Sequence, residues 1–109
     1  MKPLRTEPEA SSELEEAAVW YEGKRKNLGL EFLESVDSAL DFITRFTRAG
    51  SPVPHVAEDL PVRRVPLRRF PFHVVYLETS DAIRILAFAH GADVSAPVAE
   101  AAVVHEGRP

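Results

Sequence analysis

The feature that most constrains the fold is a change of hydrophobic period near residue 62. Up to residue 46, apolar residues recur every three or four positions, whereas from Val62 onward they alternate with polar ones. A spacing of three to four predicts amphipathic helices, and a spacing of two predicts strands with two different faces. The chain is therefore expected to place a helical first half against a sheet formed by its second half, which is an α+β layer arrangement.

Two helices are predicted in the first half. Ser12 and Glu15 have the spacing of a capping box, so the first helix is expected to begin at Ser12 and to end at the basic run 24–26. The second helix is expected over residues 32–46, followed by a surface loop at 50–61 that contains three prolines. Because the connection between the helices is short, they should pack as an antiparallel hairpin.

Three strands are predicted after the loop, at residues 62–67, 72–78 and 82–90. A short edge strand near Leu4 is also expected, and the prolines on either side of it limit its length. The element order is then β-α-α-β-β-β. We expect a helical hairpin on one face of a small, mostly antiparallel sheet.

Alternation along the strands also predicts which side chains share a face. The β-branched residues Ile83, Ile85 and Val75 are expected to pack beneath the helices. Two helices cover only one side of a sheet, so the other face would expose an apolar strip edged by basic residues. Such a strip is typical of a contact site and needs a cover, either the chain's own tail or another chain. The strip is predicted to contain Val74, Tyr76, Leu86 and Phe88, with Arg64, Arg84 and His90 at its edge.

Length and composition narrow the class of protein. The 109 residues suggest one domain, expected at 1–92, followed by an Ala- and Val-rich tail at 93–109 that forms a short helix or stays loose. The absence of cysteine excludes disulfides and thiolate chemistry and fits a cytoplasmic protein. No signal peptide or membrane-spanning run is visible. A net charge of −4 disfavours direct, sequence-independent binding to nucleic acid.

Five short motifs in a fixed order resemble the toxins of the RelE/ParE superfamily, the toxin halves of type II toxin–antitoxin modules. The similarity runs from residue 13 to residue 90 and is greatest to the ParE-like, plasmid-stabilisation branch. The motifs are Trp20-Tyr21-Glu22, Leu28-Gly29 with Glu31-Phe32, Val62-Arg63-Arg64, Leu67 with Arg69-Phe70-Pro71-Phe72, and Ala87-Phe88-Ala89-His90.

The resemblance implies the same β-α-α-β-β-β fold and a cognate antitoxin, of ribbon-helix-helix type, whose C-terminal segment wraps the toxin. It also implies action by protein binding, with DNA gyrase as the target, and no cofactor. The chain departs from the family pattern after His90, where Gly91-Ala92-Asp93 stands in place of arginines. Two alternatives stay open: a ribosome-dependent messenger-RNA endoribonuclease using Arg64, Arg68, Arg84 and Tyr76, and a non-toxic member that keeps antitoxin binding.

The arginines of residues 61–73 are the main candidate functional groups, because this segment contains no acid. They suit phosphate binding with stabilisation of transition-state charge, pairing with a partner's carboxylates, or a simple solvated surface. His73 and His90 fall on opposite faces by alternation, which argues against an acid–base pair. The four histidines lack metal-ligand spacing, so no metal is expected. The predicted partner-binding set is Arg64, Arg68, Arg69, Val74, Tyr76, Arg84, Leu86, Phe88 and His90.

Overall fold

The computed structural model describes residues 2–53 and 60–91; the predicted tail at 93–109 lies outside the described residues. The elements in chain order are β1 (Leu4–Thr6), α1 (Pro8–Lys24), α2 (Leu28–Arg45), β2 (Ser51–Pro52), β3 (Val62–Pro66), β4 (Phe72–Glu78) and β5 (Ile83–His90).

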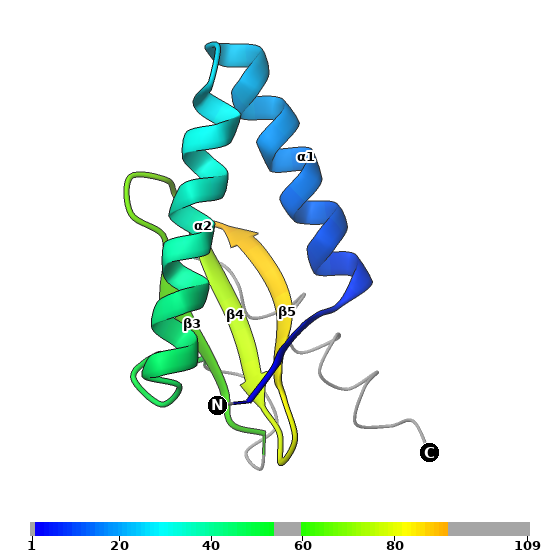
Figure 1. Ribbon diagram of the computed structural model, residues 1–109, viewed down its shortest axis with the longest axis vertical. Helices are drawn as coiled ribbons and strands as arrows, with labels where there is room; N and C mark the ends of the chain where they lie inside the picture. Colours follow the sequence, from blue (N-terminus) through cyan, green and yellow to red (C-terminus); the bar gives the residue numbers. More distant parts are fainter. Residues whose placement is uncertain (1, 54–59, 92–109) are drawn as a thin grey trace.

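The strands form one sheet in the order β1-β5-β4-β3-β2. β1 runs parallel to β5, and the other neighbours are antiparallel. Both helices lie over the same face of this sheet as an antiparallel hairpin (Figure 1). The predicted α+β class and the predicted helical hairpin on a mostly antiparallel sheet are confirmed.

Three predicted boundaries are wrong. The second helix begins at Leu28 rather than at residue 32. The first helix begins at Pro8 rather than Ser12, and its N-cap residue Glu7 makes no side-chain capping bond. Proline suits the first helical turn because its fixed φ is already helical and its missing N–H would have no partner there. The predicted loop 50–61 also begins with the two-residue strand β2, which pairs with β3 at the edge of the sheet. Pro52 is tolerated there because the outer side of an edge strand needs no donor.

The turn between the helices is fixed by one carboxylate and one close backbone approach. Glu22 accepts hydrogen bonds from the backbone N–H groups of Asn27 and Gly29, at 2.9 and 3.0 Å. A Cβ atom at Gly29 would lie 2.6 Å from the carbonyl oxygen of Ala18, so the two helices meet where only glycine fits.

Beneath the helices, four aromatic rings form the centre of the core. Phe32 from α2 has no exposed surface and lies against Tyr21 from α1, Phe70 from the β3–β4 loop and Phe72 from β4. The ring centroids are 5.1 to 5.4 Å from that of Phe32, in the tilted and edge-on arrangements that aromatic pairs prefer. This cluster attaches the helical hairpin to the sheet.

A bulge in β5 exchanges the faces of the sheet. Val75 lies opposite Ala87, but Tyr76 lies opposite Ile85, so Leu86 is an extra residue without a partner in β4. The buried residues of the face beneath the helices accordingly include Ile83 and Ile85 before the bulge and Phe88 after it.

The predicted faces are therefore only partly correct. Ile83 and Ile85 pack beneath the helices as expected, and Leu86 lies on the opposite face as expected. The prediction is wrong for Val75, which joins Leu86, Leu77 and Val62 on the far face. It is also wrong for four residues predicted on the far face that lie on the helix side: Val74, Tyr76, Phe88 and, through its contact with the Phe72 ring, His90.

Candidate functional site

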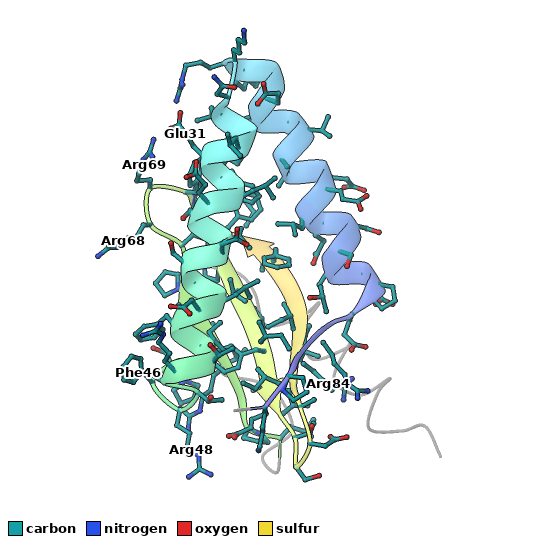
Figure 2. All side chains as sticks on the ribbon, in the orientation of Figure 1. Glu31, Phe46, Arg48, Arg68, Arg69 and Arg84 are labelled. Atoms are coloured by element: carbon teal, nitrogen blue, oxygen red, sulfur yellow. The ribbon has the colours of Figure 1, made fainter. Side chains whose placement is uncertain are left out.

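The predicted partner-binding residues do not gather at one place. Val74, Tyr76 and Phe88 are buried beneath the helices, and Leu86 is buried on the far face. Arg68 and Arg69 lie in the β3–β4 loop beside α2, whereas Arg84 lies on the other side of the molecule, near β1 and β5 (Figure 2). The predicted apolar strip with an arginine edge is thus not a continuous surface.

Arg69 helps to fix the β3–β4 loop to the start of α2. Its guanidinium lies 2.8 Å from the carboxylate of Glu31, which also pairs with Arg25 at 3.1 Å. The hydrogen bonds from Arg25 and then Arg69 hold the pKa of Glu31 below its usual value. The Ser35 hydroxyl donates to the carbonyl oxygen of Arg68 at 2.9 Å. Arg69 adopts φ 71°, so these contacts hold the loop in a backbone conformation that a non-glycine residue rarely adopts.

Arg84 forms an internal ion pair. Its Nε atom lies 3.5 Å from a carboxylate oxygen of Glu7, and both side chains are mostly shielded from solvent. Its Nη2 atom is buried, and the described residues supply no hydrogen-bond acceptor for it. This arrangement ties β5 to the segment that joins β1 to α1.

Tyr76, a residue of β4, holds the chain segment that follows α2 through its hydroxyl group. Its hydroxyl donates to the carbonyl oxygen of Thr47 at 2.6 Å and accepts from the N–H of Gly50 at 3.2 Å. Burial raises the pKa of Tyr76. Arg64 and Arg84 pair with Val75 and Leu77, residues of the opposite sheet face. The structure therefore does not bring Tyr76, Arg64 and Arg84 together as an RNA-contacting group.

The two strand histidines are separated, as predicted. His90 is exposed at the end of β5 and stands edge-on to the Phe72 ring, at 5.0 Å between centroids. His73 pairs with Ala89 and so lies on the far face, where its Nδ1 atom is buried and has no hydrogen-bond partner within the described part of the chain. The described residues also contain no cluster of three histidine, aspartate or glutamate side chains that could hold a metal ion.

A groove of about 560 Å³ runs between α2 and the β3 edge of the sheet. The buried residues Ala39, Val65 and Leu67 line it, together with the half-exposed ring of Phe42. Arg68 is a charged residue at the Ser35 end of the groove, and no acidic residue contributes to the lining. Arg64 also contributes to the lining, but its position in β3 belongs to the far face of the sheet. The full described lining is Ser35, Ser38, Ala39, Phe42, Ala49, Gly50, Ser51, Arg64, Val65, Pro66, Leu67 and Arg68. We call this surface the α2–β3 groove.

Two exposed aromatic rings near the C-terminal end of α2 were not among the predicted site residues. Phe42 and Phe46 are 40% and 58% exposed, and their ring centroids lie 5.4 Å apart. Phe46 fitted the apolar spacing expected for the second helix, whereas Phe42 lay outside that spacing. Their i, i+4 spacing places them side by side, and large exposed aromatic rings of this kind are typical of contact surfaces.

Glu13 provides a hydrogen-bond acceptor for the part of the β5 edge that does not pair with β1. β1 pairs only with Ile83–Ile85, and beyond it the N–H of Phe88 donates to a carboxylate oxygen of Glu13 at 3.1 Å. Burial raises the pKa of Glu13, and the neighbouring carboxylates Glu16 and Glu9 raise it further, although the bond from Phe88 lowers it. A raised pKa means that ionised Glu13 is less favourable in the folded than in the unfolded chain, so its contribution to stability falls as pH rises through the folded pKa.

We expect Glu13→Gln to stabilise the protein at pH 7, because glutamine keeps the oxygen that accepts from Phe88 and removes the shielded charge. The gain should disappear well below the ordinary glutamate pKa of about 4.3, where Glu13 is already neutral. Urea unfolding at pH 7 and at pH 3.5 measures the stabilisation at neutral pH and its loss in acid. Glu15→Gln, at an exposed position of the same helix, changes the net charge equally and should have little effect. Equal stabilisation by both variants would contradict this assignment.

The chain thus folds as a helical hairpin over one face of a mixed five-stranded sheet. No protein-family model matches the chain, and no curated protein sequence matches it. Among solved structures, the fold is similar to a chain from the chromosomal ParDE toxin–antitoxin system of P. aeruginosa, with a TM-score of 0.61 and 18% sequence identity. The match covers 84% of this chain and 98% of the other. The fold implied by the sequence resemblance is therefore confirmed. Within the described residues, no helix is long and apolar enough to cross a membrane.

Proposed function

We propose that this chain is the ParE-like toxin of a type II toxin–antitoxin module, and that a cognate antitoxin, of ribbon-helix-helix type, neutralises it. The observation that carries the proposal is the fold similarity, which spans nearly the whole length of a chain from a ParDE system. The sequence motifs of residues 13–90 support it independently, because they point to the same class of toxin.

The toxin acts by binding a protein target, DNA gyrase, in the cytoplasm. Two observations support binding over chemistry on RNA. The chain carries a net charge of −4, which opposes binding to a polyanion. The Tyr76 hydroxyl, a candidate group for RNA cleavage, is instead occupied by two backbone hydrogen bonds.

Induction of the chain alone in a bacterial host tests the proposal. We expect growth arrest with induction of the DNA-damage response, and co-expression of the protein encoded by the adjacent reading frame should restore growth. Purified chain should also stabilise gyrase–DNA cleavage complexes in vitro. Growth arrest with codon-positioned cuts in messenger RNA and no DNA damage would instead identify an endoribonuclease. Normal growth, at confirmed expression of folded protein, would mean a non-toxic binding module.

A further inference from the structure

We propose that a second hollow, at the end of the molecule where α2 finishes, binds the phosphate group of a small ligand. The hollow has a volume of about 430 Å³, which is within the range of small-molecule sites in proteins. Its walls come from the N-terminal segment, the chain after α2, the start of β3, and the end of β4 with the turn that follows it. We call it the basic pocket. The proposal goes beyond the proposed function, because it requires neither an antitoxin nor gyrase.

The charges that line the basic pocket do not balance. Lys2, Arg48 and Arg63 contribute three positive charges, and Glu78 contributes the one negative charge among the described lining residues. Asp81, the next acid along the β4–β5 turn, lies outside the lining and accepts a hydrogen bond within that turn. The pocket therefore has an excess of two positive charges. A phosphate monoester carries a charge of about −1.5 to −2 at pH 7, so it is complementary to this excess.

Glu78 holds two of the cations at the pocket. Its carboxylate oxygens lie 2.9 Å from the Nζ atom of Lys2 and 3.6 Å from the Nε atom of Arg48. The Lys2 ammonium also donates to the carbonyl oxygen of Thr79 at 2.7 Å, so two contacts anchor it. The Arg48 side chain is 84% exposed, and Figure 2 shows it at the end of α2 remote from Arg68. Its guanidinium can therefore form the paired hydrogen bonds that arginine makes with phosphate oxygens.

The carbonyl groups after α2 are engaged by the protein itself. A helix C-terminus is partly negative and normally disfavours an anion. Here the carbonyl of Thr47 accepts from the Tyr76 hydroxyl at 2.6 Å, and the carbonyl of Gly50 accepts from the Nη1 atom of Arg63 at 2.8 Å. These bonds reduce the repulsion that an anion would meet. Arg63 pairs with Tyr76 and so lies on the helix side of the sheet, and its guanidinium has further N–H groups for a ligand.

The overall acidity of the chain does not exclude such a site. The net charge of −4 is a sum over the whole sequence, and it opposes above all the binding of long polyanions such as nucleic acids. A single phosphate group interacts with charges within about one Debye length, which is about 8 Å at physiological salt. The local excess of cations therefore determines whether the basic pocket binds it.

Titration of the isotope-labelled full chain with inorganic phosphate, followed by nuclear magnetic resonance, tests the basic pocket. At pH 7 and constant ionic strength, the amide signals of Thr47, Thr79 and Ser80 should shift and saturate, with a Kd of about 1 mM or lower. Adenosine monophosphate and adenosine distinguish the source of the phosphate. Tighter binding of adenosine monophosphate than of inorganic phosphate would identify a phosphate ester as the ligand, and the reverse order would identify free phosphate. Adenosine, which lacks the phosphate, should not bind.

Two arginine variants test whether the cations of the pocket are responsible. Arg48→Gln should weaken phosphate binding at least about tenfold, because it removes a charge-assisted contact. The Arg48 side chain is so exposed that the variant should fold normally. Arg45→Gln is the matched control, because it removes the same charge from the same end of α2 but from a side chain that pairs with Asp41 outside the pocket. It should bind phosphate within about twofold of the unaltered chain.

Three results would overturn this assignment. The first is the absence of saturable shifts up to about 20 mM phosphate, which would mean that the pocket has no useful affinity for the group. The second is a set of shifts centred on the β3–β4 loop, which would place phosphate at the arginines there. The third is equal weakening by both variants, which would mean a general effect of surface charge. The amide spectrum of each variant also shows whether it is folded. Because no step depends on growth arrest, failure here would leave the proposed function standing.

Discussion

Replacing Phe32 with alanine should remove a large part of the stability of this domain. Phe32 has no exposed surface, and its ring contacts one aromatic ring from α1, one from the β3–β4 loop and one from β4. Phe→Ala substitutions in cores cost about 3–5 kcal/mol, because apolar area is lost and a cavity remains. Small domains have a total stability of about 5–15 kcal/mol, so much of the variant should unfold under mild denaturant. Urea unfolding followed by circular dichroism measures the loss.

Two controls make this expectation specific. Phe32→Leu keeps an apolar side chain that fills much of the same space, so it should lose clearly less stability than Phe32→Ala. Phe46→Ala removes the same ring from an exposed position of the same helix and should change stability by only about 0.5 kcal/mol. A loss below about 1 kcal/mol for Phe32→Ala would mean that the four rings do not attach the helices to the sheet.

The hydrophobic period predicted the elements well because it is a local property of the chain. The strands expected at 62–67, 72–78 and 82–90 are observed at Val62–Pro66, Phe72–Glu78 and Ile83–His90. The helical hairpin and its position on one face also follow from local spacing and a short connection. The first helix start was missed because two local signals compete, and the proline at position 8 determines it rather than the serine–glutamate pair.

The assignment of faces failed because register is not a local property. Strict alternation in β5 puts Phe88 on the side opposite to Ile85, but the bulge at Leu86 places both on the helix side. Nothing in an apolar run of this kind marks which residue is extra. The unpaired Leu86 therefore moved Phe88 into the core. Tyr76 belongs to β4, which alternates regularly, and it was assigned to the wrong face because the sequence does not show that it lies opposite Ile85.

The candidate site could not be read from the sequence for a related reason. The α2–β3 groove combines residues 35–42 with residues 64–68, and only the folding of the helix onto the sheet edge brings them together. Arg64 and Arg68 were singled out in the sequence by their charge and the lack of nearby acids. Phe42 was not, since a helical stripe does not show where the covering sheet ends. The exposed fraction of each side chain, known only from the structure, distinguishes Phe42 from the buried Ile43.

Replacing Tyr76 with phenylalanine should lower stability by about 1–3 kcal/mol, because it leaves two backbone groups without a partner. The ring itself, which is almost fully buried, would still fill the core. What is lost is the link from the carbonyl of Thr47 to the N–H of Gly50, which closes the chain after α2. A Cβ at Gly50 would collide with the Tyr76 hydroxyl, so this glycine is the partner that admits the contact.

Tyr21→Phe is the matched control for this prediction. Tyr21 is also buried, but the described part of the chain offers its hydroxyl no hydrogen-bond partner, so its removal should change stability little. Urea unfolding of both variants measures the difference, and growth arrest at reduced temperature measures activity while both remain folded. A structural Tyr76 predicts a less stable protein that still arrests growth. Unchanged stability with complete loss of growth arrest would instead place the hydroxyl in the proposed toxic activity, because the two backbone bonds would then contribute nothing that the fold requires.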